Sequence, residues 1–210
     1  KGTGAGQLFR TTLMKALFSS PAALLSTLDN RLKRLVNRQE RTTDPQVQQQ
    51  IEHDIEQLEE LRHHCVLIDQ ASFSKYQLLV DTIKNGTWDA SQADDRLVIF
   101  TESIPTLEFL QQHLPKACKL KKDQVALLRG DMSDRELADT VNSFNQKQSP
   151  LRLLLCSDVA SEGINLHHLS HRMIHFDIPW SLMVFQQRNG RIDRYGQTRQ
   201  PLIRYLLTDS

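Results

Sequence analysis

Hydrophobic residues in the first part of the chain recur at the spacing of helices. Leucines stand three or four residues apart over residues 21–38, behind two serines that can cap a helix and a proline suited to its first turn. Residues 44–64 carry a second apolar stripe, and the rest of that segment is acidic. Because fewer than three clean heptads are present, we expect a helical hairpin that packs on the neighbouring domain, and not a long coiled coil.

From residue 96 onward the apolar period alternates between two and about 3.6, which is typical of repeated βαβ units and a parallel sheet. The predicted strands are residues 97–101, 125–129, 151–156, 172–176 and 202–207. Helices are predicted near Pro105 and after Ser133, which has Glu136 at capping-box spacing. The composition changes near residue 95. We therefore expect a helical connector region over residues 1–94 and an α/β domain over residues 95–210.

The composition fits a globular chain. At about 150 residues per domain, 210 residues correspond to about 1.4 domains. Hydrophobic residues make up 39% of the chain and charged residues 24%, which excludes a fully disordered or fibrous protein. The formal net charge is +1, so any site for a polyanion must be local.

The same composition bears on location. The longest apolar runs are far below the ~18 residues needed to cross a bilayer, and no leader pattern opens the chain, so we expect neither a membrane span nor an export signal. The three cysteines, Cys65, Cys118 and Cys156, form no Cys-x-x-Cys pair. We expect reduced thiols in a cytosol-like compartment, without a disulfide framework or a thiolate zinc site.

Glycines near the start of the chain invite a phosphate-loop interpretation. Gly2, Gly4 and Gly6 are followed by no Lys-Ser or Lys-Thr pair, and no strand precedes them, so we interpret this stretch as a flexible linker. No other segment matches a nucleotide-phosphate loop or an acidic metal-holding strand end. By itself the chain is therefore not expected to hold Mg²⁺ and a triphosphate.

The strongest chemical signal is the segment 187–197, Gln-Arg-Asn-Gly-Arg-Ile-Asp-Arg-Tyr-Gly-Gln. On a helical turn Gln187, Arg191 and Arg194 share one face, and Gly190 leaves room for an approaching ligand. Two guanidiniums that converge on one point suit a transferring phosphoryl group, whose charge spreads over three oxygens. The alternative is a solvated, arginine-rich helix that pairs with Asp193.

Three weaker polar segments follow predicted strands: residues 98–103, 129–133 and 156–166. In a parallel sheet, ligands gather at the carboxyl ends of the strands, so these are the positions where a ligand is expected. In the third segment, short hydroxyl residues lead to a glycine, which allows backbone N–H groups to approach an anion. Asp158 and Glu162 in that segment are expected to be solvated or paired with the two arginines.

Taken in order, these segments resemble the second RecA-like lobe of superfamily-two helicases, specifically the Swi/Snf-type ATPases and their bacterial relatives. Residues 97–103 look like motif IV, residues 156–166 like motif V and residues 187–194 like motif VI, and residues 129–133 resemble the glycine-centred motif between the first two. Residues 175–180 are similar to the joining segment of this group. The resemblance covers residues 95 to 208 and implies a three-layer, RecA-like parallel sheet.

The resemblance also implies roles. Arg191 and Arg194 match the catalytic arginines that reach the γ-phosphate across the cleft between the two lobes, and Gln187 matches the glutamine at that interface. Gly163 and Asn165 match positions near the nucleotide. ATP and Mg²⁺ are then held mainly by an N-terminal RecA-like lobe outside this chain.

Nucleic-acid contacts are implied for short hydroxyl residues and one glycine. These are Thr101, Ser103, Gly130, Ser157 and Ser161. Contacts of this kind go to phosphates, so they are independent of sequence and weaken as salt rises.

No metal site is expected. His167, His168 and His171 lie close in sequence, as do His63 and His64, but no carboxylate or thiol completes a set of ligands. We interpret these histidines as rim or surface groups.

These expectations combine into one leading hypothesis. The chain is the C-terminal motor lobe of an ATP-dependent translocase on double-stranded DNA in the cytoplasm of a bacterial-type cell, where it could associate with the nucleoid, and it is inactive without its N-terminal lobe. Two alternatives stay open: a non-catalytic module that docks a partner through its front helices, and a helicase that separates DNA or RNA strands. The acidic helix could also bind a protein partner.

Overall fold

The computed structural model describes residues 4–158 and 163–207. The chain divides into two compact units, Lys1–Ser74 and Lys75–Ser210. The change in composition near residue 95 coincides with the start of the first strand.

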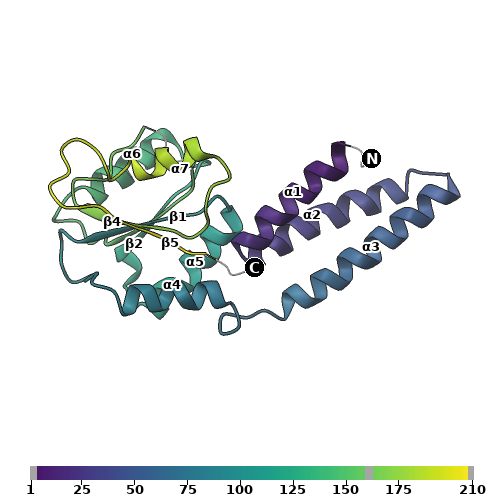
Figure 1. The fold of residues 1–210 in the computed structure, drawn as a ribbon, viewed down its shortest axis with the longest axis horizontal. Coiled ribbons are helices and arrows are strands. Elements are labelled where there is room, and N and C mark those ends of the chain that lie inside the picture. Colours follow the sequence, from purple (N-terminus) through teal and green to yellow (C-terminus); the bar gives the residue numbers. More distant parts are fainter. Residues whose placement is uncertain (1–3, 159–162, 208–210) are drawn as a thin grey trace. The chain divides into compact units, whose positions relative to one another are not determined.

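The first unit contains three helices, α1 (Gly4–Ser19), α2 (Pro21–Gln39) and α3 (Pro45–Val66) (Figure 1). Both of the longer helices begin at a cap: the Ser20 hydroxyl accepts a hydrogen bond from the backbone N–H of Ala23, and the Asp44 carboxylate accepts one from that of Gln46. A proline occupies the first turn of each, as expected from its fixed φ.

Helix α2 packs against both α1 and α3, which confirms the predicted hairpin. Leu24 and Leu28 of α2 are buried together with Cys65 of α3. Leu13 of α1 packs against the same cluster. The leucine stripe of the sequence is therefore the core of this unit.

The expected flexible linker at the glycines is wrong where the structure describes it. Helix α1 begins at Gly4 and runs through Gly6, whereas Gly2 lies outside the described residues. Glycine lowers helix propensity by only about 1 kcal/mol, and burial of an apolar residue such as Leu13 outweighs that cost.

The second unit is an α/β domain, and the predicted fold class is confirmed. Its five strands form one all-parallel sheet in the order β2-β3-β1-β4-β5. The strands are β1 (Arg96–Phe100), β2 (Val125–Leu128), β3 (Leu153–Cys156), β4 (Ser170–His175) and β5 (Leu202–Tyr205). The helices are α4 (Ser74–Lys84), α5 (Ile104–Ala117), the 3₁₀ turn η1 (Lys122–Gln124), α6 (Asp134–Phe144) and α7 (Leu182–Asn189).

Helices cover both faces of this sheet, which gives the expected three layers. In Figure 1, α6 and α7 lie on one face and α4 and α5 on the other. Every residue of β1 and β3 is buried, as expected for the centre of a parallel sheet, whereas β5 is an exposed edge strand. Helix α4 has no counterpart in the sequence prediction, although Tyr76, Leu79 and Ile83 form a buried helical stripe on it.

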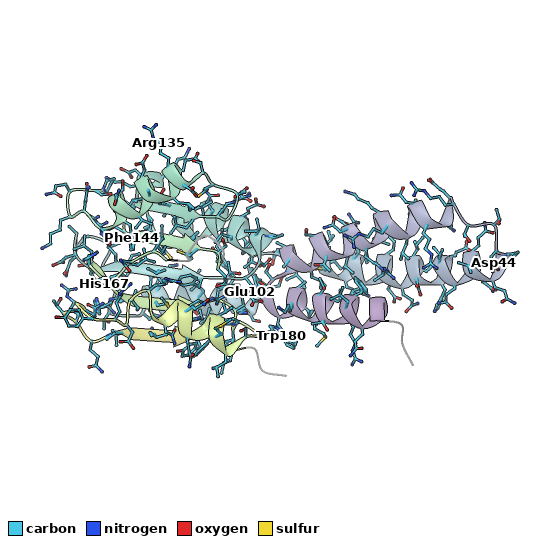
Figure 2. All side chains as sticks on the ribbon, turned by 90° about the horizontal axis from the view of Figure 1, so that it is seen from above. Asp44, Glu102, Arg135, Phe144, His167 and Trp180 are labelled. Atoms are coloured by element: carbon cyan, nitrogen blue, oxygen red, sulfur yellow. The ribbon has the colours of Figure 1, made fainter. Side chains whose placement is uncertain are left out.

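Because all strands are parallel, the residues that follow β1, β3 and β4 meet at one edge of the sheet. Figure 2 shows Glu102 and Trp180, which follow β1 and β4, at one end of this domain, and His167, which precedes β4, at the opposite end. None of the helices in the described ranges is long and apolar enough to span a membrane.

Candidate functional site

Asp177 joins two neighbouring strands at the carboxyl edge of the sheet. The Thr101 hydroxyl, just after β1, donates to Asp177 Oδ2 at 2.5 Å, and the backbone N–H of Glu102 donates to Oδ1 at 2.9 Å. Thr101 is fully buried and Asp177 nearly so. A buried carboxylate with several donors is held in one position, so this contact fixes the end of β1 against the end of β4.

Arg188 of α7 ties the same edge to β3. Its Nε and Nη2 donate to the two carboxylate oxygens of Asp158 at 2.5 and 2.8 Å, and its Nη1 donates to the backbone carbonyl of Asp177 at 2.8 Å. Only 1% of the Arg188 side chain is exposed. The planar guanidinium is suited to this two-point grip, and an arginine so placed sets the position of α7 on the sheet.

Arg188 is not marked by the sequence pattern, because it lies off the helical face that carries Gln187, Arg191 and Arg194. The available signal was Asp158, an acid directly after a buried strand, which was expected to be solvated or paired with Arg191 and Arg194. It pairs with Arg188.

His175, the last residue of β4, is a buried neutral partner in this cluster. Burial lowers its pKa to about 4. Its Nε2 lies 2.8 Å from Asn189 Oδ1, and its Nδ1 lies 3.3 Å from Arg188 Nη1. Since the guanidinium can only donate, Nδ1 accepts and Nε2 carries the proton. The ring lies near the ring of Phe185 and fixes α7 a second time.

Lys75 at the start of α4 is a further buried charge near Asp177. Its ammonium lies 4.8 Å from the centre of the Phe176 ring, and 5% of the residue is exposed. Burial lowers the Lys75 pKa to about 8, and the negative charge of Asp177 opposes that shift. Lys75 and Arg188 thus balance the charges of Asp177, which is buried, and of Asp158, whose side chain is 24% exposed.

Arg191 and Arg194 lie beyond the end of α7, because that helix ends at Asn189 and not after Arg194 as the one-face argument requires. Both arginines nevertheless contact the segment 164–166. Arg191 Nη1 donates to the backbone carbonyl of Ile164 at 3.4 Å, and Arg194 Nη1 donates to the side-chain oxygen of Asn165. The backbone carbonyl of Arg191 also accepts from the N–H of Leu166 at 3.1 Å.

Of the predicted nucleotide-binding residues, Asn165 contacts Arg194, and Gly163 directly precedes Ile164, whose carbonyl binds Arg191. Gly163 has φ +73°, which an L side chain rarely adopts, and a Cβ at that position would meet nothing within 4 Å. The Gln187 side chain is exposed on α7. The pairing of the arginines with Asp193 is not among the ion pairs of the described residues.

The residues predicted to touch nucleic acid follow three adjacent strands. Thr101 and Ser103 follow β1, Ser157 follows β3 and Gly130 follows β2. Ser161 lies outside the described residues. The structure thus brings these four residues to one edge of the sheet.

Two of these hydroxyls have structural partners. The Ser103 hydroxyl caps α5 by accepting from the backbone N–H of Thr106 at 3.3 Å, and the Thr101 hydroxyl is used by Asp177. The buried Ser157 hydroxyl has no hydrogen-bond partner in the part of the chain that the structure describes. Gly130 is exposed. Their assignment to nucleic-acid binding stays a prediction.

Comparison with protein families gives a decisive match. Residues 74–196, more than half of the chain, match the helicase conserved C-terminal domain. The chain belongs to this family. The predicted resemblance to the C-terminal lobe of superfamily-two helicases of the Swi/Snf-type group is thereby confirmed.

Curated relatives of this helicase domain are much longer proteins. The uncharacterized ATP-dependent helicase YqhH of Bacillus subtilis is 33% identical over 64% of this chain and 22% of its own length. The SNF2 domain-containing protein CLASSY 4 of Arabidopsis thaliana is 29% identical over 63% of this chain and 12% of its own length. The chain thus spans less than a quarter of either relative.

A solved structure, that of the C-terminal part of the Fun30 ATPase domain, supports the fold. It matches 90% of this chain and 68% of its own chain with a TM-score of 0.57 and 18% identity. This similarity establishes the RecA-like α/β fold of the helicase domain.

Proposed function

We propose that this helicase domain is the C-terminal motor lobe of an ATP-dependent translocase that acts on double-stranded DNA. The observation that carries the proposal is the placement of Arg191 and Arg194 against one short segment, residues 164–166, beside Gly163. Hydrogen bonds to a backbone oxygen and to an amide oxygen orient the two guanidiniums. Two oriented, permanent positive charges suit a group whose negative charge grows or shifts during the reaction.

In this proposal Arg191 and Arg194 stabilise the transferring γ-phosphoryl group, and Gln187, Gly163 and Asn165 line the nucleotide. Arginines that act on a phosphoryl group change its transfer rate by about 10³ to 10⁵. ATP and Mg²⁺ are held mainly by an N-terminal RecA-like lobe.

The carboxyl edge of the sheet then binds the nucleic-acid backbone through Ser103, Gly130 and Ser161, and the buried Thr101 and Ser157 support that edge from within. The charges of Lys75, Asp158, Asp177 and Arg188 position the segments that follow β1, β3 and β4. Contacts with phosphates release counterions, so the grip should weaken steeply with salt.

The test is ATP hydrolysis by a longer form of the protein that contains the N-terminal lobe, with double-stranded DNA, single-stranded DNA and RNA in parallel. We expect double-stranded DNA to stimulate hydrolysis most, and the stimulation to fall as salt rises. Stronger stimulation by RNA would refute the DNA assignment. Separation of a tailed duplex would favour the strand-separating helicase.

The same assay separates the proposal from a non-catalytic interaction module. A folded longer form that hydrolyses no ATP with any of the three nucleic acids would identify the module. The 210-residue chain alone should show no turnover above a control without protein. Turnover by this chain would contradict the assignment of the nucleotide to another lobe.

A further inference from the structure

Helix α2 carries a row of arginines along one side. Arg31, Arg34 and Arg38 stand three and four residues apart, so they lie within about 60° of one another around the helix axis. Arg41 follows the end of the helix at the same spacing. We call these four residues the arginine stripe. From Arg31 to Arg38 it runs about 10 Å along α2, toward the tip of the hairpin that Asp44 marks in Figure 2.

The stripe lies on the side of α2 that faces away from the acids of this unit. Asp29 and Glu40 are about 150° or more around the helix axis from the centre of the stripe. Asp29 pairs with Arg62 of α3 at 2.7 Å, whereas the guanidinium of Arg31 lies 4.8 Å from the centre of the Phe9 ring on α1. The acidic helix α3 therefore packs on the side of Asp29, and the stripe lies on the side of α1.

The charges of the first unit are divided between its helices. The sequence of α1 contains no Asp or Glu. Residues 4–41 contain seven lysines and arginines against two acids, whereas residues 42–64 contain six acids against one arginine. The unit therefore has a positive and a negative part, although the chain as a whole has a net charge of +1. A positive part of this kind is the local site that a polyanion requires.

Three of the four arginines are available to a partner. Arg34, Arg38 and Arg41 are exposed, and they form none of the ion pairs found in the described part of the chain. By contrast Arg199, which is also exposed, pairs with Asp94 at 3.2 Å. An unpaired guanidinium keeps its N–H donors for a ligand, and its planar fork matches the oxygens of a phosphate.

We propose that the arginine stripe binds the phosphate backbone of a DNA duplex. A row of guanidiniums matches a polymer that carries one negative charge per ~1.7 Å of its axis. Such contacts go to phosphates, so they read no base sequence. The stripe belongs to the first unit and is distinct from the nucleic-acid residues proposed at the carboxyl edge of the sheet. The choice of DNA over an acidic protein rests on the proposed function.

The experiment measures binding of a short fluorescent DNA duplex to the 210-residue chain by fluorescence anisotropy, without ATP and over a range of salt concentrations. Arg34→Gln combined with Arg38→Gln should weaken binding by about tenfold or more at low salt. The dependence of log affinity on log salt should become shallower by about two, since each lost phosphate contact removes about 0.9 from the slope. Because both side chains are exposed, the unfolding midpoint should not change.

Lys33→Gln combined with Lys147→Gln is the matched control, because it also removes two exposed positive charges. Lys33 lies on α2 about 130° around the axis from the centre of the stripe. Lys147 lies in the second unit, before β3. Since salt screens charges that do not touch the duplex, the control should bind within about twofold of the unaltered chain.

Four results would overturn the proposal: no binding of the duplex by the unaltered chain at low salt, unchanged binding by the folded arginine variant, an equal loss in the lysine control, or tighter binding of poly-glutamate than of the duplex. The last result would assign the stripe to an acidic protein. The proposed motor fails by a different readout. It is refuted by a lack of ATP hydrolysis in the longer form, whereas the stripe is tested without ATP.

Discussion

At the scale of single residues, the site rests on three buried charges, one partly buried carboxylate and one buried neutral imidazole. Lys75, Asp158, Asp177 and Arg188 come from four separate stretches of the chain. The sequence could suggest Asp158 because it follows a strand, but no periodicity marks Lys75 or Arg188 as buried. Their partners lie far away along the chain, so only the folded arrangement identifies them.

Replacement of Arg188 by alanine should destabilise the fold by about 3–5 kcal/mol, because it leaves the buried Asp177 carboxylate and the partly buried Asp158 carboxylate without their cation. Unfolding in urea measures the loss. Arg135→Ala, which removes a side chain 92% exposed, is the control and should lie within about 0.5 kcal/mol of the unaltered chain. Equal stability of the two variants would contradict the role of Arg188.

His175 should make the fold sensitive to acid. Its folded pKa of about 4 lies below the ordinary value of 6.5, so the unfolded chain binds more protons between these values. The contribution of the neutral imidazole is complete above pH 6.5 and is lost as pH falls toward 4. It amounts to at most about 3 kcal/mol.

The check compares unfolding free energies of the unaltered chain and His175→Phe from pH 7 to pH 4.5. The difference between the two should shrink with falling pH, since the variant has no imidazole to protonate. A difference that stays constant over this range would show that His175 is not held neutral.

At the scale of elements, the alternating period predicted five parallel strands and the hairpin of α2 and α3 correctly. The same pattern missed α4, whose buried stripe is short. It also did not predict the helix that runs through the glycine stretch near the start of the chain. It also extended α7 through Arg194, although the helix ends at Asn189. Helix ends depend on caps and tertiary contacts, such as the bond from Leu166 to the Arg191 carbonyl, which a local pattern does not contain.

Ser103 allows the capping and nucleic-acid roles to be separated. Ser103→Ala should destabilise the fold by about 1 kcal/mol, because α5 loses its cap. Ser103→Asp keeps a capping oxygen, so its stability should stay close to that of the unaltered chain, while its negative charge should weaken binding of a DNA duplex. Fluorescence anisotropy measures the binding. Unchanged affinity in Ser103→Asp would remove Ser103 from the nucleic-acid surface.

At the scale of the whole molecule, the family and the fold followed from the order of four motifs, and the match over residues 74–196 agrees with them. What no spacing could predict is the hollow before β4. It is a polar hollow lined by Asp94, Lys147, residues 167–171 and residues 197–199, four stretches that lie far apart in the sequence. The two ends of the sheet therefore differ in how far the sequence alone describes them.

The central claim is that this domain supplies the arginines of an ATP-hydrolysing motor. The most direct measurement is ATP turnover, at saturating double-stranded DNA, by a longer form of the protein with and without Arg194→Ala. Because Arg194 is exposed, the variant should keep its unfolding midpoint, and turnover should fall by about 10³-fold or more. Unchanged turnover by the folded variant would contradict the account.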